Sequence, residues 1–414
     1  MLEKENKKAL GFIFITVLID VIGLGVIIPV LPDLIQQLTG GNVSEASRYG
    51  AWLGVTYGLM QFIFSPILGG LSDRYGRRPV LLLSLMGLGC DYIFMAMAPT
   101  IAWLFVGRLI AGICGASFGT ATAYIADIST PEKRSQNFGL IGAAFGVGFI
   151  IGPTIGGIFG HWGPRIPFFI AASFSLLNLL YGYFVVPESL SMEHRRKFDW
   201  KRANPIGSLL NLRKYPVISG LVVTYLLLFM AGKSVENTWT FYNKLKFDWN
   251  SVWVGISLSV VGILIAGVQG GLIRVAIPKL GQKRAVFVGL SLSTLGLILF
   301  AFASHGWMMF IFIIPYCLGG IAGPALQGIM SGQVKVNEQG ELQGALTGLM
   351  SVTSVLGPLL MNNLFYYFTK EGAPFYFPGA AFIVGAVFMF IGIMFAIKSL
   401  KRYQPLEIPV KKES

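Results

Sequence analysis

Long apolar segments recur along the whole 414-residue chain, and they limit its fold more than any other feature. Each holds roughly 18 residues or more, enough for a helix to cross about 30 Å of hydrocarbon. Helices are expected because a backbone in lipid must satisfy its own hydrogen bonds. Charged residues make up only 12% of the chain, against about 25% in soluble domains. The sequence therefore predicts an all-α membrane protein with many spans.

Twelve spans are predicted, and a basic stretch divides them six and six. They lie near residues 10–32, 52–71, 79–98, 101–125, 136–160, 164–186, 216–243, 251–277, 284–303, 307–331, 342–368 and 374–397. The first is too long for the apolar core of a signal peptide and lacks a small-residue cleavage site, so we expect it to be retained. The predicted organisation is an N-terminal bundle (1–186), a cytoplasmic basic linker (187–215), a C-terminal bundle (216–400) and a cytoplasmic tail (401–414).

The two predicted bundles repeat short sequence patterns. GRLIAGICGA at 107–116 corresponds to PYCLGGIAGP at 315–324, and GPTIGG at 152–157 corresponds to GPLL at 357–360. Two similar bundles with a site between them near the midplane are typical of transporters. We therefore expect two pseudo-symmetric six-helix bundles.

The net charge of +13 reports orientation in the membrane. If both termini are cytoplasmic, 24 of the 32 lysines and arginines fall in cytoplasmic segments. That bias follows the positive-inside rule and favours this topology over its inverse. No nucleic-acid partner is expected.

The remaining polar residues do not indicate an enzyme. His161, His194 and His305 fall in or near separate loops, and the three cysteines lie in apolar segments without metal-ligand spacing. The chain has no Ser-His-Asp arrangement, HExxH motif or Walker loop. We expect no catalytic residues, no metal and no cofactor, so an ion gradient would supply the energy.

Three charged residues of the N-terminal half are predicted to lie inside the membrane, where a charge costs roughly 2.5–3.5 kcal/mol. Asp20 is flanked by apolar residues, and a carboxyl group in an apolar cavity can exchange a proton near neutral pH. It could instead form a structural hydrogen bond to a neighbouring helix. Arg108 needs a carboxylate, and Asp20 and Asp91 are the candidates. Arg108 would either regulate proton exchange on these groups or pin the bundle as a static ion pair.

Lys233 and Glu236 are three residues apart on one helical face. They could neutralise each other near the outer end of the helix, or they could line the outer half of a cavity and contact substrate. Gln61 and Gln269 could bind substrate polar atoms or only bond neighbouring helices. Trp239 is a further predicted substrate contact.

The stretch GGLSDRYGRRPVL at 69–81 concentrates charge between two apolar segments. The positive-inside rule explains its arginines but not its glycines or its aspartate. We predict a cytoplasmic gate in which glycine permits a tight turn and arginines hold carboxylates by forked hydrogen bonds. Its residues are Gly69, Asp73, Arg74, Gly76, Arg77 and Arg78.

These motifs resemble those of the major facilitator superfamily. GGLSDRYGRR is similar to its gate signature, FVGRLIAGICGA to a second motif that contains Arg108, and GVGFIIGPTIGG at 146–157 to a motif of its antiporters. The glycines of the last motif could also serve only close packing, and its proline bends the helix. The antiporter motif comprises Gly148, Gly152, Pro153, Gly156 and Gly157.

Within that superfamily the chain resembles the tetracycline efflux proteins, through LIDVIGLGVIIPVLP at 18–32, DYIFMAMAP at 91–99 and GPALQGIMSGQV at 323–334. The resemblance implies embedded acidic residues at Asp20 and Asp91. It fails in the C-terminal half, where Ile265 and Ser293 replace a histidine and an aspartate of those pumps and where Lys233 and Glu236 are new. A metal–tetracycline chelate would require more carboxylate than this half offers.

The function we predict is proton-coupled efflux of small organic molecules or drugs by alternating access. A proton-coupled symporter or uniporter of an organic anion is the main alternative, and a non-transporting sensor built on the same fold is another. We expect a monomer in a bacterial cytoplasmic membrane, with protons, lipid and a small-molecule substrate as its only partners.

Overall fold

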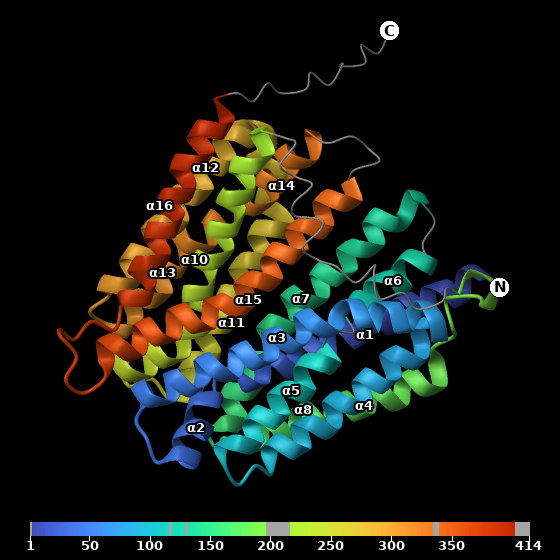
Figure 1. Cartoon of the computed structure of the whole chain (residues 1–414), viewed down its shortest axis with the longest axis horizontal. Coiled ribbons are helices and arrows are strands. Elements are labelled where there is room, and N and C mark those ends of the chain that lie inside the picture. Colours follow the sequence, from blue (N-terminus) through green and yellow to red (C-terminus); the bar gives the residue numbers. More distant parts are fainter. Residues whose placement is uncertain (1, 116–117, 129–130, 196–215, 334–338, 402–414) are drawn as a thin grey trace.

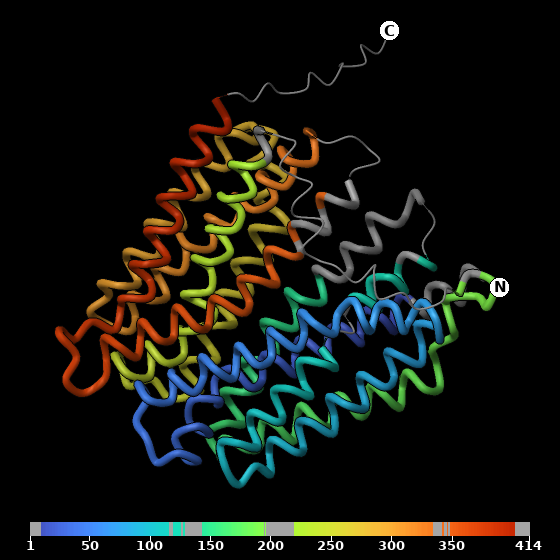
Figure 2. Tube along the Cα trace, in the orientation of Figure 1, coloured from blue at the N-terminus to red at the C-terminus, as the bar shows by residue number. Residues whose placement is uncertain are grey.

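The computed structural model describes residues 2–115, 118–128, 131–195, 216–333 and 339–401, and these parts of the chain form helices joined by short loops. Most of the predicted linker and nearly all of the predicted tail lie outside the described residues. Two bundles of helices lie against each other (Figure 1) and trace as two halves along the chain in Figure 2. The all-α fold with two bundles is as predicted.

The described part of the N-terminal bundle consists of eight helices followed by a short 3₁₀ turn. The helices are α1 (Leu2–Ile27), α2 (Leu31–Thr39), α3 (Val43–Tyr75), α4 (Arg77–Ala96), α5 (Ile101–Gly115), α6 (Phe118–Ile128), α7 (Pro131–Gly160) and α8 (Ile166–Val185), and the 3₁₀ turn is η1 (Met192–His194). Helices α5 and α6 together form one membrane span, and α2 is too short to form one. The short amphipathic α2 was not predicted. It begins with a proline in its first turn, which suits a helix start, and it buries Leu34 and Ile35.

The C-terminal bundle repeats this plan. Its elements are α10 (Pro216–Phe247), α11 (Ser251–Gly267), the π-helical turn η4 (Val268–Leu272), α12 (Ile273–Phe302), α13 (Gly306–Leu318), the 3₁₀ turn η5 (Gly319–Ile321), α14 (Ala322–Gly332), α15 (Gln339–Thr369) and α16 (Ala380–Leu400).

Eleven apolar helical stretches of the described chain are long enough to cross a membrane, and one of them is long enough to cross twice. Residues 251–302 form a 52-residue stretch, about 78 Å at 1.5 Å per residue. Gly281 interrupts it with a φ of 75°, which glycine adopts without strain. Divided at Gly281, this stretch supplies two spans and brings the total to the predicted twelve.

The bundles meet at one side of the molecule, which we call the closed side. Ser44 donates a hydrogen bond to the Thr369 carbonyl (3.1 Å), and Ser47 donates to that of Asn362 (3.4 Å), so the start of α3 contacts the end of α15. Toward the opposite, open side, where α1 starts and α16 ends, the two bundles diverge (Figure 1).

Two helix seams join the bundles, one the counterpart of the other. In the first, α7 packs on α11; in the second, α15 packs on α3. Pro153 and Pro358, which occupy equivalent places in the sequence repeat, lie at these seams. A β-carbon on Gly255 would meet the carbonyl oxygen of Pro153, and one on Gly54 would lie 3.0 Å from the Pro358 side chain. The internal repeat therefore corresponds to a structural repeat.

Candidate functional site

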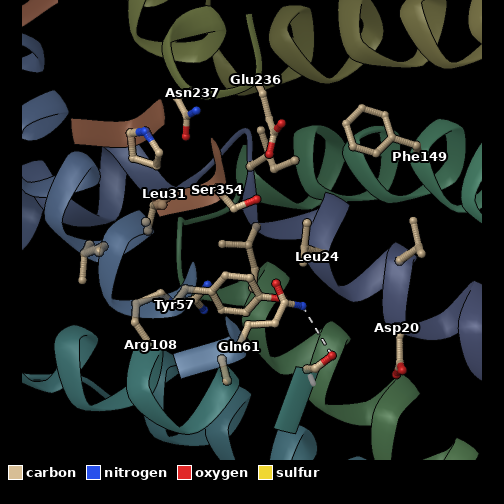
Figure 3. Close-up of a pocket in the computed structure, with 18 of the residues that line it drawn as sticks. Asp20, Leu24, Leu31, Tyr57, Gln61, Arg108, Phe149, Glu236, Asn237 and Ser354 are labelled. Atoms are coloured by element: carbon tan, nitrogen blue, oxygen red, sulfur yellow. Dashed lines mark hydrogen bonds between the residues drawn. The ribbon is translucent and has the colours of Figure 1, made fainter. Parts of the chain in front are cut away.

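A cavity of about 570 Å³ lies between the two bundles. Its walls come from both halves of the chain, and they extend from Pro32 and Asn362 near the closed side to Leu81 and Ala121 toward the open side. Most of its lining is apolar, with Leu24 and Phe149 among the side chains around it (Figure 3). A concave, mostly apolar site with a few polar groups is the usual form of a small-molecule site.

Five of the predicted site residues line this cavity. They are Asp20, Gln61, Arg108, Lys233 and Glu236. The first three belong to the N-terminal bundle and the other two to the C-terminal bundle, so the cavity presents polar groups of both halves to one space. Asp20, Gln61, Arg108 and Glu236 surround it in Figure 3.

Arg108 lies on the N-terminal wall with neutral neighbours. Its Nη2 donates to the Met95 sulfur at 2.9 Å, and its guanidinium lies 5.8 Å from the centre of the Tyr57 ring. Within the described chain, no carboxylate forms an ion pair with Arg108. The Gln61 side chain donates to Tyr57 Oη and to the Gly115 carbonyl, each at 3.4 Å (Figure 3). The positive charge of Arg108 therefore remains available to the cavity.

Asp20 projects from α1, and one of its carboxylate oxygens is buried without a hydrogen-bond partner in the part of the chain described. A buried polar atom without a partner costs free energy, so such an atom in a native site requires an explanation. Proton binding offers one, because protonation removes the charge.

Asp91 does not line the cavity. It lies on α4 and is 1% exposed, and neither of its carboxylate oxygens has a partner among the described residues. A β-carbon on Gly107 of α5 would lie 3.0 Å from Asp91 Oδ1, so the carboxyl group sits behind the cavity wall, between α4 and α5. The structure thus brings Asp91 close to the α5 turn that holds Arg108, without an ion pair.

Lys233 and Glu236 form an ion pair and also line the cavity, so the two roles considered for them are compatible. The Lys233 ammonium lies 2.8 and 2.7 Å from the two oxygens of Glu236. The lysine is about halfway along α10, rather than near its outer end. Its side chain is 12% exposed and that of Glu236 is 57% exposed. The carboxylate therefore faces the cavity, and the ammonium lies behind it.

The other two predicted substrate contacts are not brought to the cavity. Trp239 is buried in the C-terminal bundle, where its indole NH donates to Ser257 Oγ at 2.9 Å. Gln269 is exposed in the π-helical turn η4 and does not line the cavity. In this conformation neither side chain can touch a molecule bound there.

The gate stretch folds as the end of α3 and the start of α4, joined at Gly76. Arg77 is nearly buried; it pairs with Asp73 and, at 3.2 Å, with Asp127 of α6, and it donates to Ser72 Oγ at 2.7 Å. Gly76 has a φ of 106°, which favours glycine. These partners of the Arg77 side chain all belong to the N-terminal half.

The backbone NH groups of Arg77 and Arg78 donate to the Glu188 carboxylate at 2.8 and 3.2 Å, so Glu188 caps the start of α4. Arg78 also donates to the Tyr183 carbonyl at 2.7 Å, and Arg74 is exposed above the Tyr75 ring. The gate stretch is thus fastened to α8 and to the segment that follows it. A β-carbon on Gly69 would meet nothing within 4 Å.

The glycines of the predicted antiporter motif lie at helix contacts. β-Carbons on Gly148 and Gly152 would come within 2.8 Å of α1 atoms, and one on Gly156 would collide with the Val26 carbonyl. Gly157 faces the other half, where an added β-carbon would lie 2.6 Å from the Ser251 carbonyl oxygen. The motif therefore lets α7 pack closely on α1 within its bundle and on α11 across the interface.

An ion pair that sequence reasoning missed joins the halves at the closed side. Lys244 of α10 lies 2.8 Å from both oxygens of Asp33 on α2, and Ser251 Oγ donates to the same carboxylate at 2.8 Å. The Lys244 side chain is 8% exposed and that of Asp33 is 33% exposed. Only the acidic first turn of α2 could have indicated this contact, and α2 was not predicted.

Other residues of the site were also missed. Tyr57, Asn237 and Ser354 line the cavity beside the predicted residues. Tyr57 lies four residues before Gln61 and Asn237 four residues after Lys233, so helical spacing could have indicated both. Ser354 belongs to α15 and had no such signal.

Comparison with known proteins agrees with this architecture. The profile of the Major Facilitator Superfamily matches residues 13–323. The chain belongs to this superfamily. The tetracycline resistance protein of class C from Escherichia coli is 40% identical over 382 residues, with 92% of this chain and 94% of that protein aligned. The class D protein from Salmonella ordonez is 35% identical, with 96% and 98% aligned.

Solved structures of the superfamily share the fold at low identity. The human organic anion transporter MFSD10 is 22% identical, with a TM-score of 0.70 over 94% of this chain and 99% of that one. A bacterial homologue of the lysosomal transporter Spinster, inward-facing and unoccupied, is 15% identical, with a TM-score of 0.74 over 97% and 99%. This member of the superfamily is a multi-pass membrane transporter.

Proposed function

We propose that this transporter is a proton-coupled antiporter that expels small organic drugs, with tetracyclines as the first class to test. The observation that carries the proposal is Asp20, a carboxyl group with a partnerless buried oxygen in a cavity shared by both bundles. A group of this kind can bind a proton in one state and release it in another. The names of the tetracycline resistance relatives support drug efflux.

In the proposed cycle, Arg108 governs proton release. When a conformational change brings the guanidinium close to Asp20 or Asp91, it favours the charged carboxylate and expels the proton. In the present state Arg108 forms no ion pair with either carboxyl group among the described residues, which allows either one to hold a proton. Asp91 would act with Asp20 or set the position of Arg108 from behind the wall.

The gate stretch would close the open side in the opposite state, in which Asp73 and its arginines would contact the C-terminal bundle. The positive-inside bias supports a cytoplasmic open side with both termini there. The bacterial origin of the relatives supports a bacterial cytoplasmic membrane. A monomer would suffice, because one chain supplies the whole cavity.

Proton movement in proteoliposomes with an imposed pH gradient and a trapped pH dye tests the proposal. We expect tetracycline flux opposite to proton flux in the parent and loss of that coupling in Asp20→Asn. Ser173→Ala, which changes an exposed hydroxyl bonded to its own helix, is the matched control. Solute and proton moving in the same direction would establish a symporter and overturn the proposal. Drug exchange without proton flux would remove Asp20 from the mechanism.

A further inference from the structure

We infer that the Lys233–Glu236 pair is a subsite for the positively charged group of the substrate, and that the transporter favours amphipathic zwitterions. This inference rests on the proposed function, since it names the class of molecule that the cavity would carry. Its basis is the order in which the two charges of the pair face the cavity.

The carboxylate is the accessible member of the pair. The Glu236 side chain is 57% exposed, whereas that of Lys233 is 12% exposed. A carboxylate offers about four lone-pair positions, and Lys233 uses one side of each oxygen. The remaining positions face the cavity, so a donor on the substrate can bind Glu236 without breaking the pair.

The lysine is fixed in its place behind the carboxylate by α15. Gly357 lies against the Lys233 stem: a β-carbon there would be 2.6 Å from Cγ and 2.7 Å from Cβ of the lysine. An anion approaching from the cavity would meet Glu236 before it reached the ammonium. The C-terminal wall therefore favours a cation, even though it contains one charge of each sign.

The N-terminal wall has the opposite preference. Arg108 lines the same cavity, has no carboxylate partner within the described chain, and lies beside Tyr57 and Gln61. It repels an ammonium and attracts an acidic group. Glu236 and Arg108 stand on opposite walls in Figure 3, with apolar side chains such as Leu24 near the space between them. A molecule with an amine at one end, an acid at the other and an apolar body matches both walls.

Binding of three fluorescent probes to the purified full-length protein tests this inference. Dansylcadaverine carries an amine, dansylglycine a carboxylate, and Nε-dansyl-lysine both. We expect the zwitterion to bind best and the anion worst. Glu236→Gln should weaken the amine and the zwitterion about tenfold, since a hydrogen bond to a charged group is lost. It should strengthen the anion, because the repelling carboxylate is gone and Lys233 is left unpaired. Arg108→Gln should weaken only the zwitterion and the anion.

The charge-exchanged variant Lys233→Glu/Glu236→Lys keeps an ion pair on the same helical face and places the cation in front. We expect it to favour dansylglycine over dansylcadaverine, the reverse of the parent. Size-exclusion profiles and thermal unfolding verify that each variant folds. An unchanged preference in the exchanged variant, or a parent that binds the three probes equally or not at all, contradicts the inference.

These outcomes separate the inference from the proposed function. Asp20→Asn should abolish proton coupling and keep the order of probe affinities. If tetracycline and protons exchange as proposed but the charge preference does not reverse, only the inference fails. If the preference reverses and no proton flux accompanies drug movement, only the proposed function fails.

Discussion

Lys233 illustrates how much of a site depends on one glycine. Sequence spacing paired the lysine with Glu236, but it did not indicate which member would face the cavity. The answer comes from α15, where Gly357 leaves room for the lysine stem. A contact between residues more than a hundred positions apart has no local signal.

Gly357→Ala should therefore disturb the pair. The added β-carbon would overlap the Lys233 stem, and overpacking of this kind costs about 1–3 kcal/mol. We expect a lower melting temperature and a changed affinity for cationic ligands, measured by thermal unfolding and probe binding in detergent.

Gly232→Ala is the matched control. It lies beside Lys233 on α10, and its added β-carbon meets nothing within 4 Å. Alanine is the better helix former, so stability should hold or rise by up to about 1 kcal/mol. Equal losses in the two variants would contradict the role given to Gly357.

The positions of Trp239 and Gln269 mark a limit of residue-level prediction. The depth of a residue along a span can be read from the sequence, and Asp20, Gln61 and Arg108, all expected inside the membrane, line the cavity. The direction of a side chain around its helix depends on packing. Trp239 turns toward Ser257 on α11, and Gln269 lies in a π-helical turn, which alters the helical register locally.

At the scale of elements, the spans were predictable because length and hydrophobicity decide them. One helix of the N-terminal bundle, α2, was not predicted, because it is too short and too polar to be recognised as a span. The division of residues 251–302 at Gly281 also agrees with the prediction of separate segments at 251–277 and 284–303. The sequence could not predict which helices would meet at the seams, because a glycine in a helix can lie either at a close helix contact or on an open surface.

The turn between α3 and α4 requires glycine at position 76. Its φ of 106° and ψ of 158° belong to a region open essentially only to glycine, and occupying it costs another residue about 1–3 kcal/mol. A β-carbon would also collide with the Glu188 carboxylate that caps α4. We expect Gly76→Ala to lower stability and transport, measured by thermal unfolding and drug flux.

Gly40→Ala separates strain from collision. Gly40 has a φ of 69° and open space around the missing side chain, so the expected loss is about 1 kcal/mol and transport should remain. If Gly40→Ala impairs transport as much as Gly76→Ala does, the Glu188 contact is not the cause.

Gly157→Ala should push the two bundles apart at the α7–α11 seam. Its β-carbon would lie 2.6 Å from the Ser251 carbonyl and 3.2 Å from Gly255 Cα, both in the other half. Backbone atoms cannot move aside as a flexible side chain can, so we expect slower transport with the closed side destabilised. Drug flux and fluorescence energy transfer across the closed side measure the two effects.

Gly146→Ala on the same helix is the control for that variant. Its β-carbon would make an ordinary contact 3.8 Å from the Ala266 side chain. We expect near-parental transport. A comparable defect in both variants would indicate a general sensitivity of α7 to alanine.

At the scale of the whole molecule, the conformation depends on the balance between two alternative closures, one at each end. Here one end is closed by the two seams and by the Asp33–Lys244 pair. At the other end, the hydrogen bonds and ion pairs found for Arg77 and Arg78 join the gate stretch to itself, to α6, to α8 and to Glu188. A transporter must be able to break whichever closure it has formed, so neither can be very strong.

Asp33→Asn should shift this balance toward opening of the closed side. The pair is only partly buried, with Asp33 33% exposed, so we expect a loss of about 1–2 kcal/mol, below that of a fully buried pair. Spin labels at Gln37→Cys and Tyr376→Cys, both exposed, should report a longer distance by pulsed electron resonance in a background without native cysteines.

A double-mutant cycle completes that test. Lys244→Met alone should open the closed side in the same direction, and the double variant should show less than the sum of the two effects, because they remove one interaction. Strict additivity would show that the pair does not hold the side closed.

The helix contacts of the antiporter motif also restrict how this transporter can evolve. At Gly152 and Gly156, which pack on α1, and at Gly157, which packs on α11, a single added β-carbon meets backbone, so almost no substitution is tolerated there. The cavity wall is different, because its side chains can change without disturbing the surfaces on which the halves move. Resistance to a new drug should therefore arise through substitutions in the wall, while the moving parts are inherited unchanged.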